Sequence, residues 1–196
     1  NEFINLTSVI DYEQVYLKHF YDSLTLIKGI DLNSINELCD AGTGAGFPGI
    51  VLKIFFENLN ITLIDSLNKR TKFLNDVIKE LNLKKIEVIN SRIEDYSRVN
   101  REKYDIVTCR AVSKLSIISE ICIPMVKVDG YFIPMKANIE EEIKDTNYLN
   151  KLDSKIEKII KFNLPIENSI RNLIIIKKLN VTKKIYPRNF NQIKKN

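Results

Sequence analysis

Short apolar segments alternate with amphipathic segments along the chain from residue 35 onward. Five apolar runs have the length and the β-branched content of buried strands, and stretches of helical period separate them. The expected strands are 35–39, 61–64, 86–89, 104–109 and 131–135. The expected helices are 48–57, 68–82, 114–127 and 139–152, with an amphipathic helix over 11–28 before the first strand. Strands and helices that alternate in this way predict βαβ units and a parallel sheet.

The pattern changes near the C-terminal end. Two strand-like segments, 154–162 and 172–178, follow each other closely, with Pro165 and other turn residues between them, which predicts a β-hairpin. We therefore expect an α/β fold of the Rossmann-like type, in which a doubly wound, mostly parallel sheet ends in an antiparallel hairpin. The chain is interpreted as one domain over 1–196, with a helix at 11–28, a Rossmann-like core at 35–179 and a basic tail at 180–196.

Composition narrows the class of protein. A chain of 196 residues, 44% hydrophobic and 28% charged, is large enough to bury a core without disulfide bonds or metals. The three cysteines (Cys39, Cys109 and Cys122) are too few and too scattered for a disulfide framework or a metal site, so we expect no metal and a reducing cytoplasm. No apolar stretch has the length of a membrane span, and nothing resembles a signal peptide. We expect a cytoplasmic monomer without membrane contact.

The net charge of +5 is concentrated at one end of the chain. The tail over 180–196 contains five cations, namely Lys183, Lys184, Arg188, Lys194 and Lys195, and no acid. A basic tail on a neutral body suits contacts with the phosphates of a nucleic acid, although a solvated chain end has the same composition.

The clearest chemical signal is a glycine-rich stretch after the first expected strand. Residues 40–49 read D-A-G-T-G-A-G-F-P-G, so the spacing is G-x-G-x-G. The loops that bind dinucleotides have G-x-G-x-x-G, and here Phe47 occupies the place of the third glycine. Asp40 precedes the first glycine by two residues and supplies a negative charge for a cationic ligand. The expected cofactor contacts in this loop are Asp40, Gly42, Gly44 and Gly46, although a bare turn between strand and helix also contains glycines.

Two further acidic positions follow the next strands. Asp65 ends the second expected strand, where an acid accepts hydrogen bonds from ribose hydroxyls. Ile93 and Glu94 follow the third strand, where an adenine could rest. Acids at these strand ends, together with glycines and no phosphate-binding lysine, favour S-adenosylmethionine over NAD as cofactor.

The segment after the fourth strand indicates the acceptor. Enzymes that methylate exocyclic amines commonly have an Asn/Asp-Pro-Pro-Tyr turn there, and this chain has Thr-Cys-Arg-Ala over 108–111. Cys109 lacks the context of a cytosine-C5 nucleophile and is interpreted as packing. Arg110 could hold a guanine base without taking a proton. This chemistry suits the N7 atom of guanine, which has an exposed lone pair and needs no general base.

Other cations are expected near the same edge of the sheet. Lys136 ends the fifth strand and is a candidate catalytic residue, and Lys69 and Arg70 begin a helix, where a cation opposes the helix dipole. Each of these alone is more often a solvated charge. His19, the single histidine, is interpreted as structural, bonded to the backbone or to a nearby acid, rather than as a catalytic base.

These residues resemble the RsmG (GidB) family of small-subunit ribosomal RNA methyltransferases along nearly the whole chain. The matching motifs are Asn5-Leu6-Thr7, His19 with Asp22-Ser23, residues 40–49, Asp65-Ser66 with Lys69-Arg70, Ser91-Arg92-Ile93-Glu94, Arg110-Ala111 and Tyr186-Pro187-Arg188. The chain departs from the family at Ala137, where a glycine is usual, and after Arg188, where a glycine and prolines are usual.

The resemblance implies a class I methyltransferase that forms 7-methylguanine in the 530-loop region of 16S ribosomal RNA in the small ribosomal subunit. It implies cofactor contacts at Gly42, Phe47, Ile93, Glu94 and Arg110, with Asp65 at the ribose. It further implies RNA or base contacts at Lys69, Arg70, Arg92, Lys136 and Arg188. Two alternatives share the glycine loop: a methyltransferase for a small molecule, and a binding module on the same fold that transfers nothing.

Overall fold

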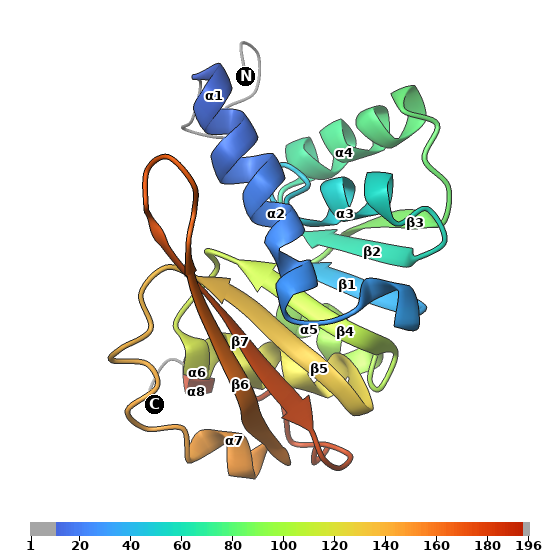
Figure 1. Ribbon diagram of the computed structural model, residues 1–196. Coiled ribbons are helices and arrows are strands. Elements are labelled where there is room, and N and C mark those ends of the chain that lie inside the picture. The colour runs from blue at the N-terminus through green and yellow to red at the C-terminus, as the bar shows by residue number, and fades with distance from the viewer. Residues whose placement is uncertain (1–10, 194–196) are drawn as a thin grey trace.

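The computed structural model describes residues 11–193 and contains a seven-stranded sheet (Figure 1). The strand order is β3-β2-β1-β4-β5-β7-β6. The strands β3, β2, β1, β4 and β5 are parallel, and β7 and β6 are each antiparallel to the preceding strand in this order. The strands are β1 Glu37–Ala41, β2 Asn60–Asp65, β3 Ile86–Asn90, β4 Tyr104–Arg110, β5 Val126–Lys136, β6 Ser154–Asn163 and β7 Ile170–Lys178. The predicted Rossmann-like topology with a C-terminal hairpin is confirmed.

Helices cover both faces of this sheet (Figure 1). On one face lie α3 Gly49–Phe55, α4 Asn68–Glu80 and the helical N-terminal segment, and on the other lie α5 Ile93–Val99, α6 Leu115–Cys122, α7 Tyr148–Lys151 and α8 Phe190–Ile193. The N-terminal segment contains α1 Tyr12–Val15, the π-helical turn η1 Tyr16–Tyr21, α2 Asp22–Leu24 and the 3-10 turn η2 Thr25–Lys28. Further 3-10 turns are η3 Leu32–Ser34 and η4 Ile123–Met125.

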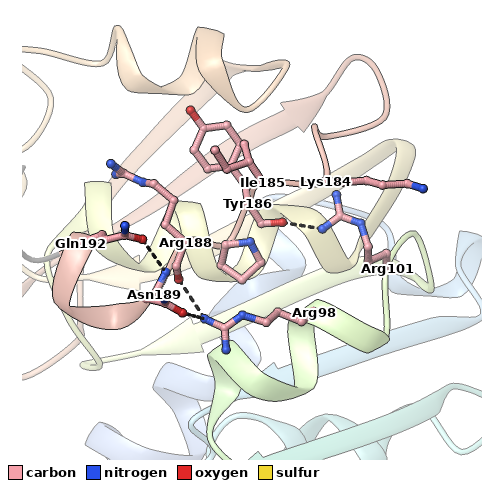
Figure 2. Close-up of a pocket in the computed structure, with 9 residues that line it drawn as sticks. Arg98, Arg101, Lys184, Ile185, Tyr186, Arg188, Asn189 and Gln192 are labelled. Atoms are coloured by element: carbon pink, nitrogen blue, oxygen red, sulfur yellow. Dashed lines mark hydrogen bonds between the residues drawn. The ribbon is translucent and has the colours of Figure 1, made fainter.

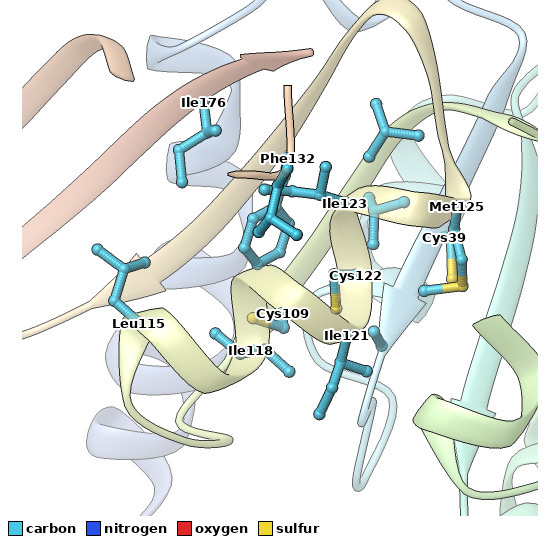
Figure 3. Packing of buried hydrophobic residues seen from close by; sticks show 14 of the residues in the cluster. Cys39, Cys109, Leu115, Ile118, Ile121, Cys122, Ile123, Met125, Phe132 and Ile176 are labelled. Atoms are coloured by element: carbon cyan, nitrogen blue, oxygen red, sulfur yellow. The ribbon is translucent and has the colours of Figure 1, made fainter. Parts of the chain in front are cut away.

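The central strands are apolar on both sides because each face packs against helices. Within β1, Leu38 belongs to the core with α3 and α4, whereas its neighbour Cys39 belongs to the core with α5 and α6. Successive side chains of a strand point to opposite faces, so a strand buried on both faces has no polar alternation. Figure 3 shows the core that packs against α5 and α6, in which Cys109 and Phe132 lie near side chains of α6, whereas Cys39 lies beside Met125.

Two predicted helices are shorter in the structure than expected, and one helix was missed. The helix expected over 114–127 ends at Cys122 and passes into the 3-10 turn Ile123–Met125, because Pro124 has no N–H group to donate to a continuing α-helix. The helix expected over 139–152 is confined to Tyr148–Lys151, and the Asp145 side chain accepts the Asn147 N–H at 2.9 Å, which stabilises a turn instead. Helix α5 was not predicted.

The order of the strands marks one place at the edge of the sheet as the expected ligand site. The chain leaves β1 toward β2 on one side and reaches β4 on the other, so the strand order reverses between β1 and β4. Ligands of open α/β sheets bind outside the carboxyl ends of the strands at such a reversal. The loops after β1, β2, β3 and β4 meet there, and these loops contain the residues predicted to bind the cofactor.

Candidate cofactor and acceptor site

The glycine loop between β1 and α3 is held together by the carboxylate of Asp40. One oxygen of this buried side chain accepts a hydrogen bond from the Thr43 hydroxyl at 2.7 Å and another from the Gly49 N–H at 2.8 Å. The other oxygen, Oδ1, has no hydrogen-bond partner among the described residues. Asp40 therefore fixes both ends of the loop and keeps one buried oxygen for another group.

Burial raises the pKa of Asp40 to about 6, although the hydrogen bonds from Thr43 and Gly49 oppose this shift. A nearby cation stabilises the ionised form of a carboxylate that is shielded from water. S-adenosylmethionine has a sulfonium and an ammonium group, so this position fits a cationic ligand. The prediction of a negative charge beside the loop agrees with this environment.

The glycines of the loop serve two different purposes. At Gly44, with φ of +61°, an added Cβ would meet no atom within 4 Å, so the backbone faces open space. At Gly46, with φ of +97°, a Cβ would lie 2.5 Å from the Ile50 side chain. At Gly42, with φ of +78°, it would lie 3.0 Å from Val112, in the loop after β4. Gly44 leaves room for a ligand, whereas Gly42 and Gly46 allow close packing.

Asp65, at the end of β2, joins the neighbouring loop to the glycine loop. Its carboxylate accepts hydrogen bonds from the Gly44 N–H at 3.1 Å, the Leu67 N–H at 2.9 Å and the Arg70 guanidinium at 3.3 Å. The side chain is buried and lies directly beside the open space at Gly44. An acid in this place is suited to a ribose, whose hydroxyl groups would donate to the same oxygens.

The adenine side of the predicted site lies at the start of α5. Glu94 is buried and pairs with the exposed Arg92 at 3.0 Å. The Ile93 side chain lies 3.4 Å from the place of a Cβ on Gly42, so it borders the glycine loop. Thus the ends of β1, β2 and β3 bring the predicted cofactor residues to one edge.

Arg110, at the end of β4, is held by the N-terminal helical segment. Its Nη1 donates to the Lys18 carbonyl at 2.8 Å and to the Asp22 carboxylate at 3.3 Å, and its Nη2 lies 3.2 Å from Nδ1 of His19. The guanidinium also lies over the ring of Phe47, 5.6 Å from its centroid. These contacts place Arg110 between the glycine loop and the helix that precedes the sheet.

The ring of His19 stacks on Phe47, with centroids 4.8 Å apart and an angle of 15° between the planes. Because a guanidinium can only donate, Nδ1 of His19 must be the acceptor, and its proton is on Nε2. Burial, and secondarily the charge of Arg110, lowers the pKa of His19 and favours this neutral form. His19 therefore orients Arg110. The sequence predicted a backbone or acid partner for His19. A hydrogen bond with the Lys18 backbone and the charge of Asp22 do act on His19, both raising its pKa, and Arg110 is a further partner that was not foreseen.

Residues 1–174 match the family model described as rRNA small subunit methyltransferase G. The chain is 48% identical over 193 residues to the ribosomal RNA small subunit methyltransferase G of Staphylococcus carnosus, and the match covers 96% of the chain and 80% of that protein. It is 46% identical over 192 residues to the protein of the same name from Bacillus subtilis, with the same coverage. The chain belongs to the rRNA small subunit methyltransferase G family.

Solved structures support the same fold. A SAM-dependent methyltransferase from Aquifex aeolicus has a TM-score of 0.60 at 16% identity, covering 86% of this chain and 94% of that chain. An rRNA methylase from Streptococcus thermophilus has a TM-score of 0.54 at 16% identity, covering 88% of this chain and 100% of that chain. The family and the fold predicted from the sequence are confirmed, and the chain is a methyltransferase. The roles of single residues stay predictions.

In this member of the rRNA small subunit methyltransferase G family, Lys136 is already paired. Its ammonium group donates to the Ser113 carbonyl at 2.8 Å and to the Glu142 carboxylate at 2.9 Å. Glu142 also accepts the N–H of Leu115, the first residue of α6. Lys136 thus lies beside the loop after β4, as predicted, but a nucleotide would have to share it with Glu142.

The predicted RNA-binding cations differ in how accessible they are. Lys69 is exposed, whereas Arg70 pairs with Asp65 and Arg92 pairs with Glu94. Arg188 binds both oxygens of Glu120, at 2.9 and 2.7 Å, and so holds the tail against α6. Lys194, Lys195 and the Asn5-Leu6-Thr7 motif lie outside the described residues. Lys69 is therefore the most accessible of these cations for a phosphate.

Cys109 lies 3% exposed in the core beside α6 (Figure 3), and burial raises the pKa of its thiol far above the ordinary value. This environment agrees with its interpretation as packing. Across residues 11–193 the structure has no group of three or more potential metal ligands among His, Cys, Asp and Glu. In the same range no helix combines the length and the apolar character needed to cross a membrane.

Sequence reasoning missed several residues of the site. Thr43 and Val112 complete the glycine loop, and Arg171 contacts the Asp22 carboxylate at 3.2 Å from β7. Thr43 lies inside the recognised motif, and its hydroxyl could have been assigned to Asp40 by its spacing. Val112 and Arg171 carried no local signal, because only the folded chain brings them to the site.

Proposed function

We propose that this protein transfers the methyl group of S-adenosylmethionine to the N7 atom of a guanine in the 530-loop region of 16S ribosomal RNA, in the cytoplasm. The arrangement around Arg110 carries the proposal. Its guanidinium donates hydrogen bonds at the acceptor edge, and its neighbour His19 is neutral with Nδ1 already used. A site that offers a donor and lacks a poised base suits an acceptor atom that has a lone pair and no proton.

The residues of the chain would divide the work as follows. Asp65 would accept hydrogen bonds from the ribose, and Asp40 would face the cationic part of the cofactor. The open space at Gly44 would let the cofactor approach the backbone of the loop. Arg110 would donate to O6 of the guanine and so orient N7 toward the methyl group. When bound, S-adenosylmethionine supplies a methyl group on a sulfonium centre. Catalysis is then mostly positioning.

The charges balance without a proton transfer. Transfer of a methyl group from a sulfonium centre to N7 would break the bond from sulfur to carbon and form the bond from N7 to carbon. It would leave a neutral thioether and a cationic guanine ring, so no residue of the chain would have to take a proton. A bare arginine beside a base that becomes cationic would oppose the reaction, and the carboxylate of Asp22 beside Arg110 offsets this repulsion.

The test is transfer of labelled methyl to free 16S RNA and to intact small subunits, followed by mapping of the modified base. Arg110→Ala should lower the rate of transfer at least a hundredfold, to a residual rate that single-turnover assays can still measure, while circular dichroism shows an intact fold. Asp65→Ala should weaken cofactor binding at least tenfold in calorimetry, whereas Asp76→Ala, an exposed acid on α4, should leave it unchanged. Methylation of a small molecule but not of RNA would refute the proposed substrate. Absence of S-adenosylmethionine binding would refute the proposed methyl transfer.

A further inference from the structure

Asp22 is a buried acid that lies outside the predicted cofactor residues. Its side chain is 2% exposed, and one oxygen contacts two guanidinium groups, Arg110 at 3.3 Å and Arg171 at 3.2 Å. Arg110 comes from the end of β4 and Arg171 from β7. One carboxylate therefore joins the N-terminal helix, the acceptor edge of the sheet and the C-terminal hairpin.

The Asp22 carboxylate offsets two effects that disfavour the charged form of Arg110. Burial lowers the pKa of Arg110, and the nearby positive charge of Arg171 acts in the same direction. The negative charge of Asp22 opposes both effects. Without Asp22, two guanidinium groups would face each other in a partly buried place, and Arg110 would turn toward solvent or toward another acid.

The helix contributes two more acceptors for the same guanidinium. The Lys18 carbonyl and Nδ1 of His19 both belong to the π-helical turn Tyr16–Tyr21, directly before Asp22. Such turns occur frequently at functional sites. Three of the five N–H groups of Arg110 are thus used, and the Nε N–H and one Nη2 N–H are left for a ligand.

We propose that Asp22 is the positioning residue of the methyl-transfer site, which holds the guanidinium of Arg110 over Phe47 with its remaining N–H groups directed at the acceptor base. This inference rests on the proposed function, in which Arg110 orients a guanine. Asp22 acts through Arg110 and touches neither base nor cofactor. A purely structural salt bridge would stabilise the helix without affecting the turnover of bound substrate.

The experiment is a double-mutant cycle with Asp22→Asn and Arg110→Ala, followed by methyl transfer to small subunits. Asp22→Asn should lower kcat at least tenfold and change KM for RNA less than threefold. In the Arg110→Ala background the same change should cause no further loss, because the group that it positions is absent. Losses that multiply would overturn the proposal, since Asp22 would then act independently of Arg110.

A matched control separates positioning from helix docking. The side chains of Lys18 and Glu167 form an ion pair at 3.1 Å that ties the same helical segment to the hairpin, and Arg110 contacts the backbone carbonyl of Lys18 rather than this pair. Glu167→Gln should therefore leave kcat within about twofold of the wild type, and an equal loss of kcat in Glu167→Gln and Asp22→Asn would overturn the proposal.

The NMR signal of the Arg110 Nε–H gives a readout without RNA. It should show an ordered side chain in the wild type and a mobile one in Asp22→Asn. Unchanged order would also overturn the inference, whereas failure of wild-type transfer would refute only the proposed function.

Discussion

At the scale of single residues, Asp40 should make the affinity for the cationic cofactor depend on pH. Its pKa is raised to about 6 by burial, so the carboxylate becomes protonated as the pH falls through this value. A bound cation favours the ionised form, and affinity for S-adenosylmethionine should therefore drop below pH 6, by up to about tenfold per pH unit. Calorimetry between pH 5 and 8 would measure this. Asp40→Asn should bind more weakly and lose this part of the pH dependence.

The stability of the protein should change in the opposite direction at this residue. Because the pKa of Asp40 is higher in the folded protein than its ordinary 3.8, protonation favours the folded state. This contribution is fully present below pH 3.8 and is lost as the pH rises through about 6. Weak binding at pH 5.5 with an undiminished melting temperature would thus identify Asp40. A dissociation constant that is flat across this range would contradict its role at the cofactor.

At the scale of structural elements, the sequence predicts what is local. The β strands were found within two residues at each end, apart from the start of β5. The central strands are recognisable because a strand covered on both faces produces an unbroken apolar run. Helix α5 was missed, since its seven residues carry little periodicity. The helix expected over 139–152 was overestimated because the Asp145 side chain stabilises a turn before Tyr148. In the site, the glycine loop and Asp65 were recognisable as motifs. The contact between Asp22 and Arg110 joins residues 88 positions apart and could not be inferred from spacing.

Two glycines of the loop between β1 and α3 should respond differently to alanine. At Gly49 a Cβ would lie 2.2 Å from the Leu63 side chain and 2.9 Å from Asp40, so Gly49→Ala should lower the free energy of unfolding by about 1–3 kcal/mol. At Gly44 nothing lies within 4 Å, and Gly44→Ala should cost about 1–2 kcal/mol for the left-handed backbone alone.

The affinity for the cofactor should also distinguish Gly44→Ala from Gly49→Ala. The methyl group of Gly44→Ala would fill the space beside Asp65 that we assign to the ligand, so its dissociation constant for S-adenosylmethionine should rise at least tenfold. Chemical denaturation and calorimetry on the same samples would measure both quantities. Normal affinity in Gly44→Ala would mean that the cofactor binds elsewhere.

At the scale of the whole molecule, the basic tail lines a hollow that lies away from the glycine loop. Arg101 donates to the carbonyls of Tyr186 and Thr182, both at 2.5 Å, and Arg98 donates to the Arg188 carbonyl at 3.0 Å. Figure 2 shows the bonds from Arg101 to Tyr186 and from Arg98 to Arg188. The resulting hollow has a volume of about 670 Å³, and the residues that line it include four cations and no acid. The described part of the tail is therefore fixed to the end of α5 through its backbone. The exposed Lys183 and Lys184 stay available to a polyanion, whereas Arg188 is paired with Glu120.

This arrangement makes the salt dependence of RNA binding informative. Lys184 lines the hollow and is exposed, whereas the adjacent Lys183 is exposed but lies outside the lining. Each cation that neutralises a phosphate contributes about 0.7–0.9 to the slope of log affinity against log salt concentration. Lys184→Gln should therefore reduce this slope for 16S RNA by about one and weaken binding, with cofactor affinity unchanged, and Lys183→Gln should have a smaller effect. Filter binding between 50 and 300 mM salt decides the matter, because equal slopes for the two variants would assign the contribution of the tail to net charge rather than to this hollow.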